Sequence, residues 1–408
     1  MMSEAALYQQ ILGLKAPWVV SSVQLDEPRQ SIIVTIAYAS QAGFKCPICH
    51  NASRHYDSRF RKWRHLDTCQ YQTLIQANVP RVHCTSHGYQ TLQVPWASGS
   101  SRYTELFEMR VLTLLAMSSL NAVSRFFKLS WGAMDRIMAR AVYRGLAKRK
   151  LINTDYLLVD ETALKKGHEY VTLLSNHEGQ VLAVSEGRSA ASFDACLKQL
   201  PADALRQTQS ICMDMSPTYI KAAKKALPNA ERKIAFDHFH VAKMLTEAVN
   251  RIRKDELFRL APSMRQEAHR TRFYWLKRRD NLSEPDRERV NRLIPAMMNT
   301  ALAWYFKEQA RNIWHGNSVR GTKQRWKDWI ALAKASGLKP LMAVADTIEN
   351  KLWGILNAMR FGLSNGLAEA INSQVRQLRV KAMGYRNSER FQRAILFHFG
   401  KLDMGFHQ

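Results

Sequence analysis

Two acidic residues end an apolar run in the stretch YLLVDE, where Asp160 and Glu161 follow Val159. The chain around them is strongly basic, with 60 Lys and Arg residues against 34 Asp and Glu residues and a formal net charge of +26. Because such a chain repels cations overall, a carboxylate at the end of a strand indicates a local task, and the candidate task is to hold a divalent metal ion. A second apolar run, SICMDMS, brings Asp214 to a comparable position.

A third carboxylate, Glu369, lies in a segment whose apolar residues recur at the spacing of a helix. It stands off that apolar stripe, on the side of Asn372 and Arg376, and considered alone it would be an ordinary solvent-facing glutamate. Phosphoryl transfer can use two metal ions about 3.5–4 Å apart, one for the attacking and one for the leaving oxygen. Carboxylates from two neighbouring strand ends and one helix can build such a site, so we expect Asp160, Asp214 and Glu369 to bind Mg²⁺ or Mn²⁺.

The other polar residues near these strand ends are weaker candidates. Glu161 directly follows Asp160, so on a strand its side chain points to the opposite face, and we do not expect it to be a metal ligand. Asp237 ends the apolar run KIAFD and is followed by His238 and His240. We expect these three residues to border the site, with direct metal contact by Asp237 as the lesser alternative.

Two pairs of potential metal ligands, each with a two-residue gap, lie in the N-terminal part of the chain. The stretch CPIC contains Cys46 and Cys49, and CTSH contains Cys84 and His87. Three Cys and one His can close a tetrahedral Zn²⁺ site, whereas unliganded cysteines are the plainer alternative. The long separation between the pairs requires the intervening segment to fold as an insert. Three further residues are possible substitutes as ligands: Cys69, His83 and His50.

The segment 104–150 has helical apolar spacing interrupted at two serines, Ser119 and Ser130, which suit helix N-caps. This pattern predicts a helix-turn-helix, with a first helix over 119–127 and a recognition helix over 131–141. A helical hairpin in a linker would look similar. Four arginines are expected to contact DNA, two on the recognition helix and two near Glu369: Arg136, Arg140, Arg376 and Arg379.

From residue 155 onward, three short apolar runs separated by turn residues predict an antiparallel meander, and two further strands end on Asp214 and Asp237. Residues 241 to about 360 are helical in pattern and rich in Arg, Lys and Trp, and those Trp residues are more often core than base-stacking platforms. The expected fold is an α/β multidomain chain with an RNase H-like mixed sheet interrupted by a helical insertion. The expected parts are a zinc-binding module with a strand, a helix-turn-helix, the first part of the core, the basic insertion and the final part of the core: 1–97, 98–150, 151–240, 241–360 and 361–408.

Composition narrows the class of partner. A pI near 10 with charge spread through helical segments suits a polyanion, and nucleic acid is the leading one. No apolar stretch approaches the roughly 18–20 residues of a membrane span, and the N-terminus MMSEAALYQQ is not a signal peptide. Six cysteines in a chain of 408 residues fit a reducing cytoplasm and a metal site better than a disulfide framework. We therefore expect a cytoplasmic, DNA-binding protein.

Taken together, these motifs resemble the ISL-three family of bacterial insertion-sequence transposases. The similarity runs over nearly the whole chain, through CPIC, WRHLD, VPRVHCTSHG, VDE, MDMSPTY, FDHFHV, SNGLAEAIN and GYRN. The resemblance implies a DDE catalytic triad, which falls on Asp160, Asp214 and Glu369. It also implies an N-terminal zinc-binding module, whose ligands fall on the two pairs described above: Cys46, Cys49, Cys84 and His87.

The leading expectation is a transposase that binds terminal inverted repeats, hydrolyses a phosphodiester at each end of its element and joins the freed 3′-OH to target DNA. Such two-ended chemistry implies at least a homodimer on DNA. Two alternatives stay open at this point. One is a zinc and helix-turn-helix regulator whose core has lost activity, and the other is an RNase H-like nuclease that cuts without strand transfer.

Overall fold

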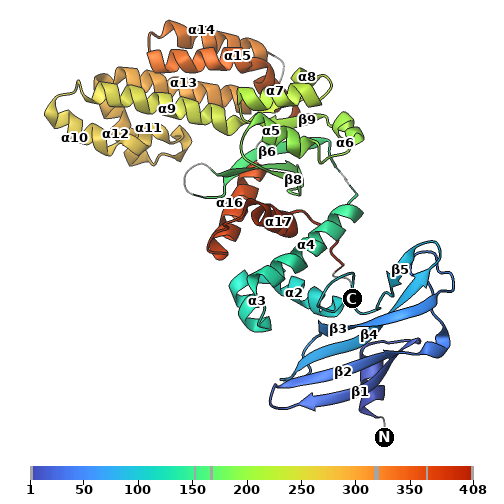
Figure 1. Cartoon of the computed structure of the whole chain (residues 1–408). Helices are drawn as coiled ribbons and strands as arrows, with labels where there is room; N and C mark the ends of the chain where they lie inside the picture. Colours follow the sequence, from blue (N-terminus) through green and yellow to red (C-terminus); the bar gives the residue numbers. More distant parts are fainter. Residues whose placement is uncertain (1–2, 151–152, 166–168, 317–320, 364–365, 406–408) are drawn as a thin grey trace. The chain divides into compact units, whose positions relative to one another are not determined.

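The computed structural model describes residues 3–150, 153–165, 169–316, 321–363 and 366–405 (Figure 1). The chain forms two compact units, one of Met1–Arg144 with Asp403–Gln408 and the other of Gly145–Leu402. None of the helices in the described ranges combines the length and the apolar character that a bilayer crossing requires. The finer division into five parts, with boundaries at 97, 150, 240 and 360, stays a prediction.

The first unit begins with a helix and a five-stranded sheet. Its strands run in the order β1-β2-β4-β3, and β5 pairs with the far end of β4. One side of the sheet buries Trp63 and Trp96, whose rings meet edge to face at 5.3 Å, and Trp18 contacts Trp96 at 5.1 Å. These elements are α1 (Glu4–Ile11), β1 (Trp18–Asp26), β2 (Ser31–Tyr38), β3 (Arg54–Arg64), β4 (Gln72–Cys84) and β5 (Gly88–Thr91).

The antiparallel hairpin β3–β4 is the insert that the spacing of the cysteine pairs requires. It pairs Arg54 with His83 at one end and Arg64 with Leu74 at the other. The short hairpin β4–β5 then turns back at Gly88, which has a φ of 64° that favours glycine. The four predicted ligands therefore flank the same end of this hairpin, although Cys49 and Cys84 are far apart in sequence.

Three helices follow: α2 (Glu105–Met117), α3 (Leu120–Phe127) and α4 (Trp131–Lys148). The two predicted N-caps are confirmed, since the hydroxyl oxygens of Ser119 and Ser130 accept hydrogen bonds from the backbone NH of Ala122 and Ala133. The helix predicted over 119–127 is confirmed as α3. The recognition helix is longer than the predicted 131–141, because the following residues, VYRGLAK, consist largely of helix formers.

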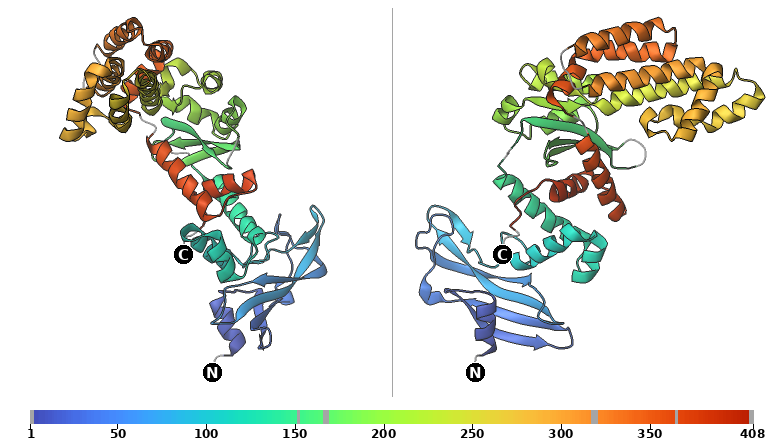
Figure 2. Two further views of the ribbon diagram at one scale, coloured as in Figure 1. Left: turned by 90° about the vertical axis from the view of Figure 1, so that its left-hand side faces the viewer. Right: turned by 180° about the vertical axis from the view of Figure 1, so that it is seen from behind.

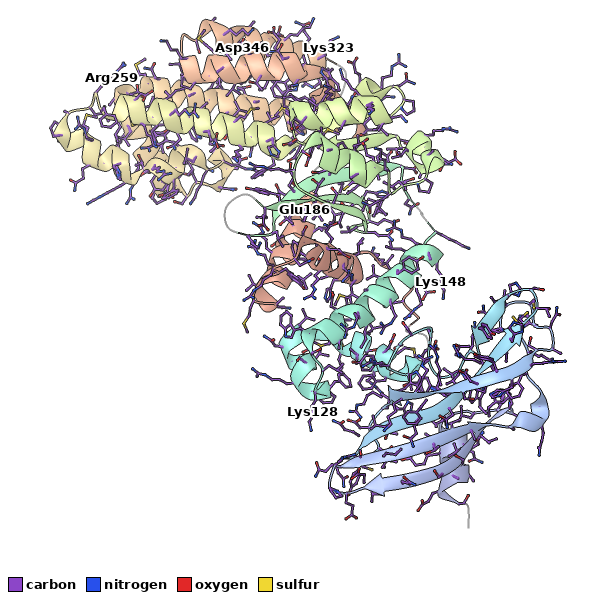
Figure 3. All side chains as sticks on the ribbon, viewed as in Figure 1. Lys128, Lys148, Glu186, Arg259, Lys323 and Asp346 are labelled. Carbon is purple, nitrogen blue, oxygen red and sulfur yellow. The ribbon has the colours of Figure 1, made fainter. Side chains whose placement is uncertain are left out.

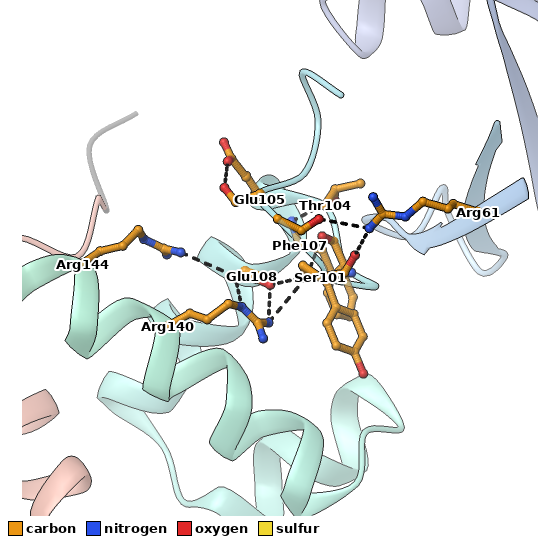
Figure 4. Close-up of polar contacts among 11 residues, drawn as sticks. Arg61, Ser101, Thr104, Glu105, Phe107, Glu108, Arg140 and Arg144 are labelled. Atoms are coloured by element: carbon orange, nitrogen blue, oxygen red, sulfur yellow. Dashed lines mark hydrogen bonds and ion pairs between the residues drawn. The ribbon is translucent and has the colours of Figure 1, made fainter. Parts of the chain in front are cut away.

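A buried carboxylate ties α2 to α4 (Figure 4). Glu108 is only 4% exposed, and its carboxylate accepts hydrogen bonds from the guanidinium of Arg140 and, at 2.6 Å, from the hydroxyl of Ser101. Arg144 Nη1 adds a longer ion pair at 4.0 Å to the same carboxylate. Arg140 was predicted to contact DNA, and its guanidinium is instead engaged inside the unit in this structure. DNA contact by Arg140 stays a prediction, whereas Arg136 is exposed and free of this network.

We expect Glu108→Ala to destabilise the packing of α2 on α4 by about 2 kcal/mol. This value is lower than that for breaking a fully buried ion pair, because both arginines are partly solvated. The substitution leaves two guanidinium groups facing each other without a shared anion. Hydrogen exchange at the amides of α2 and α4 measures this local free energy of opening. Arg110→Ala removes an exposed charged side chain from the same helix and is the matched control, with an expected change below about 0.5 kcal/mol. Equal protection in the two variants would refute the assigned role of Glu108.

The second unit is built around a second five-stranded sheet with the order β10-β9-β6-β7-β8. Strands β6, β7 and β8 form an antiparallel meander, and β9 and β10 run parallel to β6. This confirms the mixed sheet and the five strands that the sequence predicts. The strands are β6 (Tyr156–Ala163), β7 (Tyr170–Asn176), β8 (Val181–Glu186), β9 (Ser210–Met213) and β10 (Ile234–Phe236).

Helices cover both faces of this sheet (Figure 2). One face buries Leu157, Val159 and Ile211 against α5 (Ala190–Leu197) and α7 (Pro217–Ala226). On the other face, Ala368 at the start of α16 (Gly366–Lys381) packs against Leu158 of β6 and Cys212 of β9. Helix α17 (Ser388–Phe399) lies against β8 on that second face. Two short helices that the sequence did not predict, α6 (Ala202–Gln207) and α8 (Ala230–Lys233), precede β9 and β10.

The helical insertion between β10 and α16 is confirmed. Its first helix starts three residues earlier than expected, at His238, because Asp237 caps it by accepting a hydrogen bond from the backbone NH of Phe239. The Trp residues of the insertion are largely core, with Trp275 and Trp326 fully buried. Cationic side chains such as Arg259 project from its surface (Figure 3). The helices are α9 (His238–Leu257), α10 (Pro262–Arg270), α11 (Arg272–Leu276), α12 (Glu284–Leu293), α13 (Met298–His315), α14 (Thr322–Ala335) and α15 (Lys339–Phe361).

Candidate functional site

Two of the predicted catalytic carboxylates belong to adjacent parallel strands. Leu158 of β6 is in register with Cys212 of β9, and the residues two positions further on are Asp160 and Asp214. Pairing between the strands has ended at this point, so both carboxylates lie where the sheet opens. Carboxyl ends of parallel strands are the usual place for a ligand site in open α/β sheets.

The neighbouring strand β10 adds a third carboxylate, because Asp237 directly follows Phe236, which is in register with Met213. Asp237 is 2% exposed, and its Oδ2 lies 3.1 Å from Nδ1 of His240, one helical turn further along α9. This hydrogen bond is the main cause of the raised pKa of His240, and the charges of Asp237, Asp214 and Asp160 raise it further. His240 therefore lies among the carboxylates, whereas the ring of His238 contacts Trp314 instead.

Burial raises the pKa of Asp160 to about 6, and the charges of Glu161 and Asp237 contribute to the increase. Burial also raises the pKa of Glu161, and the charge of Asp214 contributes there. Acidic side chains that are difficult to ionise because they are buried together are a common feature of sites that receive a cation.

Glu161 was expected to point away from Asp160. The hydroxyl of Tyr219 on α7 acts to lower the pKa of Glu161, whereas the Asp160 carboxylate accepts a hydrogen bond from Asn372 on α16. These two helices cover opposite faces of the sheet. The charge of Asp214 nevertheless contributes to the raised pKa of Glu161. That Glu161 is not a metal ligand stays a prediction.

Helix α16 holds the third predicted carboxylate. Asn372 Nδ2 donates to Asp160 Oδ2 at 2.6 Å and to the backbone carbonyl of Glu161 at 3.2 Å. Glu369 lies one helical turn before Asn372 on the same helix and is exposed. Among the described residues, Asp160, Asp214 and Glu369 do not lie close enough together to share one ion, so the catalytic role of Glu369 stays a prediction.

Asn372 is a residue whose role the sequence reasoning did not identify. It is 8% exposed, and its side-chain oxygen Oδ1 has no hydrogen-bond partner within the described ranges. An amide oxygen left unpaired beside Asp160 suits a hard cation or a water molecule bound to one. The carboxylate oxygens together with this amide oxygen are ligands that fit Mg²⁺ or Mn²⁺. In the sequence, Asn372 could have been found from its position three residues after Glu369, on the same side of the helix.

The two arginines of α16 differ in their surroundings. Arg379 Nη1 donates to the backbone carbonyl of Ala163 at 2.6 Å and so fixes α16 to the end of β6. Arg376 is exposed. DNA contact stays a prediction for both, and Arg379 has a structural contact that the sequence did not predict.

The cysteine and histidine cluster of the first unit is compact. The ligand atoms of Cys46, Cys49, Cys84 and His87 all lie within 4.8 Å of one another. Cys49 Sγ is 3.7 Å from Cys84 Sγ, and His87 Nδ1 is 3.8 Å from Cys46 Sγ and 3.7 Å from Cys84 Sγ. A tetrahedron with Zn–S bonds of about 2.3 Å has edges of about 3.8 Å, so these separations fit Zn²⁺.

The surroundings of Cys84 favour its thiolate, whereas burial and the neighbouring thiols of Cys84 and Cys46 raise the pKa of Cys49. Hydrogen bonds from the backbone of Ser86 and from His87 lower the pKa of the Cys84 thiol to about 6, which favours the thiolate that binds Zn²⁺. Of the possible substitutes, Cys69 is exposed at the turn between β3 and β4, and the ring of His83 packs 4.8 Å from Tyr89. Neither belongs to the compact cluster, and neither does His50.

Three models of known protein families match parts of the chain. A transposase family model matches residues 157–395, a zinc-finger model of the transposases IS204, IS1001, IS1096 and IS1165 matches residues 42–87, and a model of the helix-turn-helix domain of transposase family ISL3 matches residues 92–142. The chain therefore belongs to the ISL3 family of transposases.

Two curated relatives are similar over most of their length. The transposase for insertion sequence element IS1001 of Bordetella parapertussis is 29% identical over 364 residues, covering 87% of each chain. The transposase for insertion sequence element IS1557 of Mycobacterium tuberculosis is 26% identical over 424 residues, covering 95% of this chain and 94% of the relative.

Proposed function

We propose that this protein is an active DNA transposase that cleaves a phosphodiester at each end of its element and transfers the freed strands to target DNA. The observation that supports the proposal is the position of Asp160, Asp214 and Asp237 just beyond the last residues that pair the adjacent parallel strands β6, β9 and β10, in a chain of the ISL3 family. Its substrates are terminal inverted repeats and target DNA in the bacterial cytoplasm. Acting at two ends requires at least a homodimer on DNA.

In this proposal Asp160, Asp214 and Glu369 hold two Mg²⁺ or Mn²⁺ ions. Such ions activate the attacking oxygen and stabilise the leaving oxygen of an in-line displacement. The protein contributes the carboxylates and their fixed geometry: Asn372 orients Asp160, and the hydrogen bond to Asp237 orients His240. The exposed position of Glu369 on α16 leaves its carboxylate accessible to the ions and the DNA phosphate.

A joining assay tests this function against both alternatives. The protein, Mg²⁺, a fragment carrying the DNA that brackets the gene, and a supercoiled target plasmid are incubated together, and product junctions are sequenced. We expect cleavage at the element ends and their covalent joining to the plasmid. Cleavage without joining would mean a nuclease, and specific binding without cleavage would mean a regulator.

DNA recognition is proposed to divide between the N-terminal reading elements and the basic helical insertion. We expect a fragment of residues 1–150 to keep its preference for the element ends but to bind them more weakly than the whole chain. The logarithm of its binding constant should fall less steeply with salt, because each lost phosphate contact removes about 0.9 from the slope. Binding is measured by fluorescence anisotropy over a range of salt concentrations. A fragment that binds random and end DNA equally would contradict this division.

A further inference from the structure

A cavity of about 270 Å³ lies beside the start of α9, enclosed by that helix, by α13 and by the residues that follow α11. None of Asp160, Asp214 and Glu369 lines it. Ligand sites are typically clefts of at least about 300 Å³ that combine an apolar lining with a few polar groups. This cavity, which we call the α9–α13 pocket, is near that size and has both kinds of lining.

The apolar part of the pocket presents flat rings. The ring of His238 lies 4.7 Å from that of Trp314 and 5.0 Å from that of His315. The ring of His238 is half-buried against these two rings and offers an aromatic surface. Phe239 also lines the pocket, and it is 52% exposed, so its ring is not part of the hydrophobic core.

The polar part of the pocket carries an excess of positive charge. Arg278, Lys307 and Arg311 line it together with a single acidic residue, Glu308. Lys307 Nζ is held by the backbone carbonyls of residues 276 and 277, at 3.2 and 2.6 Å, and Arg311 pairs with Glu308 and Asp280. Arg278 is exposed and has no ion-pair partner among the residues that the structure describes. It is therefore available to an anion.

The first turn of α9 borders both the pocket and the carboxylates of Asp160, Asp214 and Asp237. Asp237 caps α9 and pairs with His240 on the side of the carboxylates, whereas His238 faces Trp314 in the pocket. One turn of an α-helix rises about 5.4 Å, so residues 237–240 bring the carboxylate of Asp237 and the lining of the pocket to the same end of α9. A DNA strand with a phosphate at the carboxylates therefore passes close to this end of α9.

We propose that the α9–α13 pocket binds one nucleotide of DNA that has left the base stack, with its base against Trp314 and His238 and its phosphate at Arg278. Flat rings beside cations are the chemistry that binds unstacked nucleotides without requiring a particular sequence. Enzymes that act on DNA extrude nucleotides in this way at a cost of a few kcal/mol, which such a pocket offsets. The inference rests on the proposed function in one respect, namely that the substrate is DNA.

The first test measures binding of a fluorescent 12-nucleotide single-stranded DNA to the full-length, zinc-loaded protein without added Mg²⁺ or Mn²⁺ and without chelator, so that no cleavage occurs. We expect Trp314→Ala to weaken binding about tenfold, within the range for loss of one stacked base, and Trp314→Phe to restore most of it. Arg278→Ala, at an exposed position, should weaken binding severalfold and reduce the salt slope by about 1. Tyr305→Ala removes an exposed aromatic ring from α13 outside this pocket, so it is the matched control and should bind like wild type.

The second test locates the base. Single abasic positions are introduced one at a time into DNA that carries an element end, whose specific binding fixes the register, and we expect wild type to lose about tenfold affinity at one or two of them. At those positions Trp314→Ala should lose nothing further, because the stacking is already absent. Wild-type binding by both Trp314→Ala and Arg278→Ala would overturn the proposal, as would an equal effect at every abasic position. Neither result depends on Mg²⁺, Mn²⁺ or cleavage, so failure of the catalytic assignment is distinguished from failure of the pocket.

Discussion

Asp160→Asn is expected to abolish DNA cleavage, with a loss of several orders of magnitude in rate, while binding to the element ends is kept or tightened. Asn has nearly the shape of Asp and keeps a hydrogen bond to Asn372, but it removes the anionic metal ligand. Asp214→Asn and Glu369→Gln should have the same effect. Combining them should add little, because residues that act as one unit are not additive. Cleavage is followed as release of a labelled 3′ end in Mg²⁺.

The stability of Asp160→Asn separates a catalytic from a structural defect. Because the folded state raises the pKa of Asp160 to about 6, ionisation of this group opposes folding, and the penalty grows from about pH 4 to pH 6 and is complete above pH 6. At pH 7 the neutral Asn removes this penalty, so the variant should unfold at a temperature no lower than wild type. Glu186→Gln, an exposed carboxylate at the end of β8 in the same sheet, is the matched control (Figure 3) and should cleave like wild type. An Asp160→Asn protein that cleaves at a near wild-type rate would refute the assigned role.

Cys49→Ser is expected to release zinc and to abolish specific binding to the element ends. Binding of a structural zinc ion contributes directly to folding, with apparent free energies of about 10–16 kcal/mol in zinc-finger peptides, and a hydroxyl is a poor substitute for a thiolate. Wild-type protein purified without chelator should contain one zinc ion per chain by mass spectrometry of the intact protein, and the variant should contain none.

Cys69→Ser is the matched control for the zinc prediction. Cys69 is exposed in the same module and lies outside the cluster, so this variant should keep its zinc and its DNA binding. Wild-type protein that contains no zinc would contradict the account of the N-terminal module. A Cys49→Ser protein with full zinc content would show that another residue completes the site.

The sequence predicted those features that depend on local patterns. A short apolar run identified β6, and the two-residue gaps identified Cys46, Cys49, Cys84 and His87, because buried strands and zinc loops are specified over a few residues. The caps at Ser119 and Ser130 were found for the same reason.

The contacts that the sequence did not predict join residues far apart in the chain. Arg140 appeared to be a surface residue of a recognition helix, but its partner Glu108 lies 32 residues earlier. Asn372 and Asp160 are 212 residues apart, and no periodicity within either segment indicates that they meet. The α9–α13 pocket depends on how two helices pack against each other, and the pattern of residues within either helix does not indicate that packing.

The most direct test of the central claim is the joining assay carried out with Glu369→Gln. Glu369 is the member of the proposed catalytic set that comes from a helix. If joining requires Glu369, then α16 completes the site that Asp160 and Asp214 begin. We predict that wild type joins element ends to the target plasmid in Mg²⁺, whereas Glu369→Gln binds the ends equally well and forms no joined product. Joined product from Glu369→Gln at the wild-type rate would contradict the account.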